Sequence, residues 1–164
     1  MKLKLLTKKK QSGFTLLESL MSLFVLTVGI LGVAGMQMQG MKAGNVAKQR
    51  MIAVSFTEEL MERIRANPAA VSDYGTVTPA SNGCSSGAVC TATEMAADDL
   101  FVWDAGVNNA LPGAPTVNVT VTPVDDVVLD PGNLGRSISI DISWADRDYT
   151  HSFNSTALIN VVQP

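Results

Sequence analysis

A run of 23 mostly apolar residues near the start of the chain, residues 14–36, limits what this sequence can fold into. As a helix it would span about 34 Å at roughly 1.5 Å per residue, which is enough to cross a hydrocarbon core of about 30 Å. One ionisable residue, Glu18, lies inside the run. An ionisable group in a segment suited to lipid indicates a function and requires a partner.

The residues before this run are basic, and they predict its orientation. Five of the twelve basic residues precede Gly13: Lys2, Lys4, Lys8, Lys9 and Lys10. Lysines on this side place the N-terminal end in the cytoplasm, so the remainder would face the extracytoplasmic side. In that oxidising compartment the only two cysteines, Cys84 and Cys90, favour a disulfide over a metal site or free thiols.

Three interpretations fit the N-terminus. A secretory signal would be cut near Gly32 and Ala34, but Glu18 at the start of its apolar region argues against it. A plain membrane anchor leaves Glu18 without a partner. In the third interpretation, cleavage between Gly13 and Phe14 leaves the apolar helix on the mature protein.

The third interpretation follows a resemblance. The stretch KKKQSG followed by FTLLES, residues 8–19, resembles the leader of type IV prepilins and pseudopilins: basic residues, glycine, phenylalanine, and glutamate at the fifth mature position. The resemblance implies that a prepilin peptidase cuts after Gly13 and methylates the new N-terminus at Phe14. It also implies that Glu18 pairs with the N-terminal amine of a subunit during filament assembly, which would offset the desolvation of both charges.

The helical pattern continues beyond the apolar run. Apolar residues recur every four positions at Ile52, Phe56, Leu60 and Ile64, with charged residues on the other faces, so an amphipathic helix is predicted up to Asn67-Pro68. Five glycines interrupt the middle, and each costs about 1 kcal/mol relative to alanine in a helix: Gly29, Gly32, Gly35, Gly40 and Gly44. They could permit close helix contact or local melting, or reflect ordinary anchor flexibility.

The rest of the chain predicts a small α+β head. Residues 68–90 read as loop, and Thr91 and Glu94 have the spacing of a capping box before a short helix that places Trp103 in the core and ends at Pro112-Gly113. Alternating valines over residues 117–121, alternating isoleucines over 138–144 and a last segment over 150–162 predict an antiparallel sheet of three or four strands. A turn is expected at Asp146-Arg147-Asp148.

The expected fold class is therefore α+β, a pilin fold in which a long N-terminal helix, transmembrane and then amphipathic, packs on a small antiparallel sheet. The expected organisation is a leader over residues 1–13, the long helix over 14–67 with its transmembrane half at 14–36, and a globular head over 68–164.

Short motifs in the head resemble those of minor pilins of the type IV pilus: ELMERIRANP at 59–68, the two cysteines, the tryptophan helix, LPGA at 111–114 and ISIDISW at 138–144. This resemblance implies a subunit that is anchored in the inner membrane with a periplasmic head and then enters the pilus. The implied partners are the prepilin peptidase, other minor pilins, the major pilin, the assembly machinery of the inner membrane and, before assembly, membrane lipid. A complex of minor pilins would prime assembly, sit at the tip and support adhesion and twitching motility.

Other functions find less support in the residues. The only histidine, His151, lies in an expected strand and no cluster has metal-ligand spacing, so neither an enzyme nor a cofactor is predicted. Asp125, Asp126 and Asp130 form an acidic loop that does not match an EF-hand, and a solvated turn is favoured over a cation site. Without residues 1–13 the chain holds seven basic and fifteen acidic residues, hence a net charge of −8, which argues against nucleic-acid binding.

Two alternatives to the minor pilin remain. One is a minor pseudopilin of type II secretion, and the other is a singly anchored extracytoplasmic factor.

Overall fold

The computed structural model describes residues 13, 15–124, 134–147 and 149–161. The acidic loop with Asp125, Asp126 and Asp130, and also Phe14 and Asp148, lie outside these residues. The chain divides after Asn45 into two units, and the long helix α1 (Leu16–Ala66) contributes to both. Each unit is described by itself.

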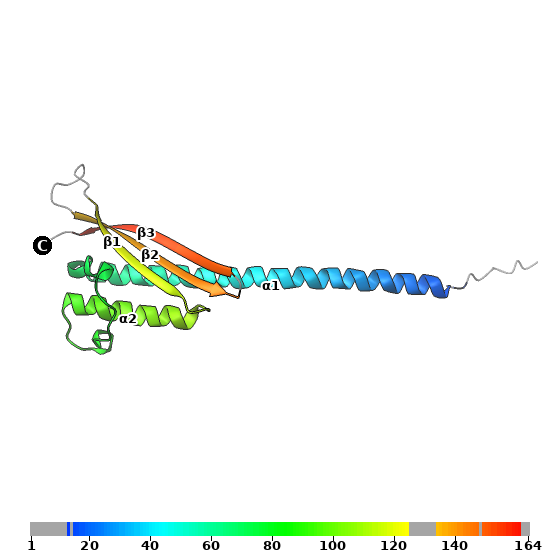
Figure 1. The fold of residues 1–164 in the computed structure, drawn as a ribbon, viewed down its shortest axis with the longest axis horizontal. Coiled ribbons are helices and arrows are strands. Elements are labelled where there is room, and N and C mark those ends of the chain that lie inside the picture. The colour runs from blue at the N-terminus through cyan, green and yellow to red at the C-terminus, as the bar shows by residue number, and fades with distance from the viewer. Residues whose placement is uncertain (1–12, 14, 125–133, 148, 162–164) are drawn as a thin grey trace, which may run out of the picture. The chain divides into compact units, whose positions relative to one another are not determined.

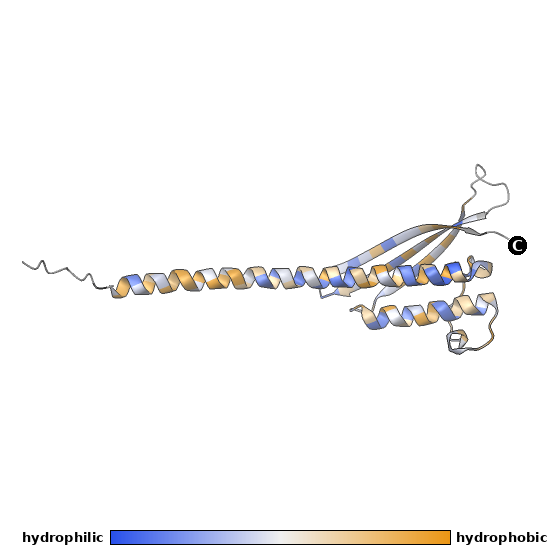
Figure 2. Ribbon diagram, turned by 180° about the vertical axis from the view of Figure 1, so that it is seen from behind, coloured by the Kyte–Doolittle hydropathy of each residue, from blue (hydrophilic) through white to orange (hydrophobic). Residues whose placement is uncertain are grey.

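The first unit is the apolar part of α1. Every described residue of α1 up to Asn45 is exposed, and the helix continues through its five glycines without a break. Apart from the adjoining backbone of α1 itself, a methyl group added at any of these glycines would meet no atom within 4 Å. Figure 2 shows that this stretch is mostly apolar along its length, as expected for a helix that crosses lipid or lies in a protein core.

The second unit, which begins at Val46, is a two-layer α+β head. After α1 come three short 3-10 helices, η1 (Pro68–Ala70), η2 (Asp73–Gly75) and η3 (Cys84–Ser86), and then α2 (Ala92–Ala110). Three strands follow: β1 (Thr116–Val124), β2 (Leu134–Asp146) and β3 (Tyr149–Val161). They form one antiparallel sheet in the order β1-β2-β3 (Figure 1). The predicted α+β fold class is confirmed, and of the three or four strands expected the described residues form three.

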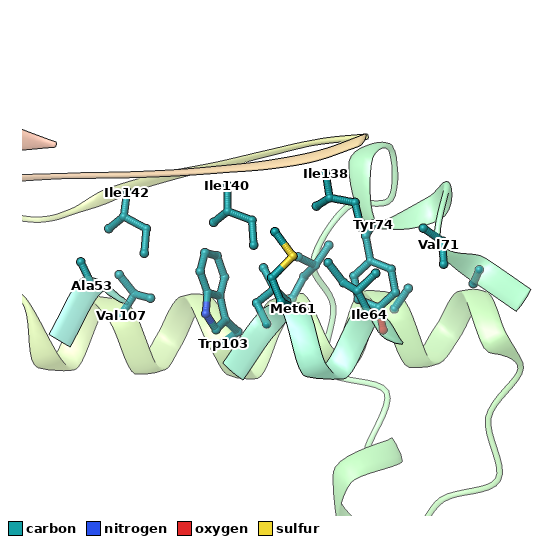
Figure 3. Packing of buried hydrophobic residues seen from close by; sticks show 14 of the residues in the cluster. Ala53, Met61, Ile64, Val71, Tyr74, Trp103, Val107, Ile138, Ile140 and Ile142 are labelled. Atoms are coloured by element: carbon teal, nitrogen blue, oxygen red, sulfur yellow. The ribbon is translucent and has the colours of Figure 1, made fainter. Parts of the chain in front are cut away.

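The core lies between the sheet and the two helices. Ile140 and Ile142 point from β2 toward Trp103 and Val107 of α2, while Ile138 points toward Met61 and Ile64 of α1 (Figure 3). The indole of Trp103 is 1% exposed, and its N–H donates to the carbonyl oxygen of Phe56 at 2.7 Å. Trp103 is therefore a core residue, as its helical spacing predicts.

The buried face of α1 is wider than the expected one. Leu60 and Ile64 are fully buried as predicted, while Ile52 and Phe56 are only partly buried. The buried face also includes Ala53, Thr57 and Met61. The hydroxyl of Thr57 donates to the carbonyl oxygen of Ala53 at 2.9 Å, which satisfies this polar group inside the core.

Local signals explain where the head elements begin and end. At the start of α2, Thr91 and Glu94 form the predicted capping box, with each side chain bonding the backbone N–H of the other. At its end Gly113 has a φ of +73°, and a side chain there would overlap the backbone carbonyl of Ala145. The LPGA stretch is thus a turn that brings the chain against β2.

Candidate assembly segment and disulfide loop

The apolar part of α1 begins with a cap that the sequence analysis missed. The backbone N–H of Glu18 lies 3.3 Å from the hydroxyl oxygen of Thr15 and 3.0 Å from its carbonyl oxygen. Thr15 therefore acts as the N-cap of α1, and the spacing Thr15-x-x-Glu18 is the signal that could have shown it. Glu18 lies in the first helical turn, where a carboxylate interacts favourably with the positive end of the helix dipole.

The surroundings of Glu18 are apolar and exposed. Leu16, Leu17 and Leu20 expose 89%, 75% and 66% of their surface. Farther along, the hydroxyls of Ser22 and Thr27 donate to carbonyl oxygens three residues earlier, at 2.9 and 2.8 Å. Since these polar groups are satisfied within the helix, the carboxyl group of Glu18 is the ionisable group that a lipid or protein environment would have to accommodate here.

By length and composition, α1 is the candidate membrane-spanning helix among the described residues. Of the predicted processing residues, Gly13 precedes the helix and Phe14 lies outside the described residues, so the cleavage and methylation sites remain predictions. Glu18 lies within the described residues, and it is the acidic residue in the first turn of α1.

The second candidate region is the loop that carries the cysteines. Cys84 and Cys90 form the predicted disulfide, which closes a loop beside the start of α2. One carboxylate, Asp98 of α2, organises this loop and is only 2% exposed. It accepts backbone N–H bonds from Asn82 and Gly83 at 2.7 and 2.9 Å, and from Ser85 at 3.0 Å.

The electrostatics of Asp98 follow from these bonds. The N–H of Ser85, followed by those of Asn82 and Gly83, lowers the pKa of Asp98 below its ordinary value, although burial acts in the opposite direction. The charged carboxylate is thus the form that holds the loop. Sequence reasoning missed Asp98 because an acidic residue in a helix gives no local sign that it is buried.

A second charged network joins the two helices next to this loop. The guanidinium of Arg63 donates to Glu59 and, at 2.9 Å, to Asp99, which also accepts the hydroxyl of Tyr74 at 2.6 Å. Burial opposes the charge on Arg63, but its bonds to Glu59 and Asp99 keep its pKa above the ordinary value. Burial and the bond to Asp99 raise the pKa of Tyr74. Each group therefore has a structural partner.

The remaining candidates for chemistry were a metal cluster and the single histidine. No group of three or more His, Cys, Asp or Glu side chains there could hold a metal ion. His151 packs on Trp144, with ring centroids 5.7 Å apart, which agrees with a strand-packing histidine.

The α+β fold and the apolar N-terminal helix together fit a membrane-anchored subunit of the pilin class. A family model of the prokaryotic N-terminal methylation motif matches residues 8–34, and one described as type IV pilin Tt1218 matches residues 35–101. These adjoining matches support a type IV prepilin-like family for the chain, with a pilin or pseudopilin as its kind of subunit. No curated protein and no solved structure matches. The pilin family is structural, which favours a role other than catalysis.

Proposed function

We propose that the chain is a minor pilin of the type IV pilus, of the kind called PilV or type IV pilus modification protein. The observation that carries this proposal is a carboxylate, Glu18, in the first turn of an exposed apolar helix directly after a Gly-Phe junction. The two family matches support the pilin class. The head motifs, with their disulfide and tryptophan helix, support the minor-pilin kind.

Processing would create the group that Glu18 requires. In this proposal the prepilin peptidase cuts after Gly13 and methylates Phe14, which releases an amine next to the apolar helix. The carboxylate of Glu18 pairs with such an amine when the subunit leaves the lipid and enters the filament. Pairing offsets a desolvation that amounts to several kcal/mol for each isolated ion.

The subunit would therefore have two locations. Before assembly it is a single-pass protein of the inner membrane, with a cytoplasmic N-terminus and a periplasmic head. It then joins other minor pilins in a complex that primes the pilus, sits at its tip beside the major pilin, and supports adhesion and twitching motility. The assembly machinery of the inner membrane is its remaining partner.

Mass spectrometry of the mature N-terminus is the first test. We expect a methylated Phe14 at the start of the mature chain. A start near residue 35 would instead identify a secreted factor. Deletion of the gene then distinguishes the two filament systems, because loss of surface pili supports the pilus and loss of exoprotein secretion supports a type II pseudopilin.

The Glu18→Ala variant tests the pairing. We expect cleavage to continue while recovery of the chain in sheared filaments falls at least tenfold, since an unpaired buried amine would remain. The matched control is Glu58→Ala, which removes an exposed carboxylate from the head part of the same helix. Equal recovery of the two variants would contradict the pairing.

A further inference from the structure

The two edges of the sheet differ in how they are covered. At the β1 edge, η2 lies so close that a side chain on Gly75 would come within 3.0 Å of the backbone nitrogen of Val121. Strand β3 forms the opposite edge, and within the described residues no strand pairs with its far side. Alternate residues of an edge strand direct N–H and C=O groups outward, which is a template for a further strand.

The sequence of β3 lacks the usual protection of an edge. From Tyr149 to Val161 it contains no Pro, Lys, Arg, Asp or Glu. Natural edge strands commonly carry such residues because they block pairing with another chain. Thirteen uncharged residues at an open edge would accept an uncharged strand without burying an ionised group.

An apolar hollow lies beside the C-terminal half of this edge. Its volume is about 290 Å³, and its lining residues come from the end of α1, η1 and β3: Ile64, Arg65, Pro68, Val71, Leu158 and Ile159. The one charged group, Arg65, already pairs with Glu62. The hollow therefore matches an aliphatic side chain rather than a charged one.

Leu158 departs from the pattern of its strand in a way that fits this hollow. Four exposed residues that precede Leu158 on the same face of β3 are polar, namely Thr150, Ser152, Asn154 and Thr156. Leu158 is apolar and 69% exposed. An exposed leucine beside an apolar hollow on an open strand edge combines the two features of strand addition, main-chain bonds for affinity and a pocket for specificity.

We propose that β3 and this hollow bind an uncharged β-strand from the head of a different pilin-like subunit, which adds to the sheet as a fourth strand and places an aliphatic side chain in the hollow. Pairing with the strand edge requires an extended main chain in the partner. Since neither β3 nor the hollow offers an unpaired charge, the partner strand should be uncharged as well. The identity of the occupant as a neighbouring pilin rests on the proposed function, which places such heads side by side.

Photo-crosslinking of the full chain in its own cells tests this surface. A photoreactive amino acid replaces Thr156, or Thr120 as the matched control. Both residues are exposed and lie in the same row of the sheet, each paired with Ser139, but Thr120 belongs to the covered edge. We expect several-fold more crosslinking from position 156, at an uncharged strand of another pilin-like chain. Equal yields, or adducts on lipid, a helix, a charged loop or a second copy of β3, would overturn the proposal.

A second variant tests the hollow. Leu158→Lys should lower crosslinking from position 156 about tenfold, because it places a charge where an aliphatic group packs. Val89→Lys is the control, since Val89 is fully exposed and lies outside the hollow. Unchanged crosslinking in Leu158→Lys, with the thermal unfolding of the head unaltered, would refute the hollow. Crosslinks are measured both in the membrane fraction and in filaments. If the chain is absent from filaments, the proposed pilin function is refuted, while crosslinking at the β3 edge can still be measured in the membrane fraction.

Discussion

The two parts of α1 are continuous in the backbone but opposite in burial. Up to Asn45 every described residue is exposed, although most are apolar. Beyond Val46, one face of the helix is buried, with Leu60 and Ile64 fully inside the core. Burial of apolar surface stabilises a protein by about 25 cal/mol per Å². The second part of α1 gains this free energy by packing on its own chain, whereas the first part can gain it only from lipid or another subunit. The comparison separates a part of the helix that folds with the head from a part whose apolar surface is available for the proposed assembly.

The largest effect on the head should come from its central aromatic residue. Trp103→Ala removes a fully buried indole and its bond to the carbonyl oxygen of Phe56, so we expect the free energy of unfolding to fall by about 3–5 kcal/mol. Phe101→Ala, on the exposed side of the same helix, should change it much less. Chemical denaturation of the full chain in detergent micelles, followed by circular dichroism, measures both. Similar losses would show that the core is not where we place it.

A smaller loss is expected from the turn after α2. Gly113→Ala places a side chain at positive φ and against the backbone of Ala145, so the free energy of unfolding should fall by about 2 kcal/mol or more. Gly87→Ala provides the control, because Gly87 also has positive φ but open space around it. We expect the control to lose about 1–2 kcal/mol from backbone strain alone. If both variants lost the same amount in denaturation, the contact with Ala145 would contribute nothing.

Much of the division between the apolar first part of α1 and the folded head could be predicted from the sequence. The apolar run, Pro68 and the capping box at Thr91 are local signals that placed the two helices, and the alternating valines and isoleucines placed the first two strands, because each signal acts over a few residues. The disulfide between Cys84 and Cys90 was predicted from the oxidising compartment expected for the head. What was missed depends on tertiary contacts. Nothing local distinguishes Asp98, which bonds three loop N–H groups, from an exposed aspartate, or shows that Met61 rather than Phe56 is deeply buried.

Acid should loosen the disulfide loop through Asp98. Its pKa in the folded state lies below the ordinary value of 3.8, so the charged form stabilises the fold above about pH 4, and this contribution is lost as the pH falls through the lowered pKa. The free energy of unfolding of the wild type should therefore fall more steeply below pH 4 than that of Asp98→Asn. Asp104→Asn is the control, since Asp104 accepts a side-chain bond from Asn108 rather than loop N–H groups. Parallel pH profiles for wild type and Asp98→Asn would exclude the loop bonds as the cause.

The smallest effect on folding is expected from the first part of α1, and it gives the most direct test of the comparison. Leu26→Ala and Leu60→Ala are the same substitution in the same helix, but Leu26 is 59% exposed and Leu60 is fully buried. Leu60→Ala should lower the free energy of unfolding of the head by about 2–5 kcal/mol, and Leu26→Ala should leave it unchanged within about 0.5 kcal/mol. In filaments the same leucine at position 26 would pack against neighbouring subunits, so its loss should appear as reduced recovery in sheared pili. A folding defect in Leu26→Ala would mean that the first part of the helix stabilises the head and that its exposed surface is not reserved for assembly.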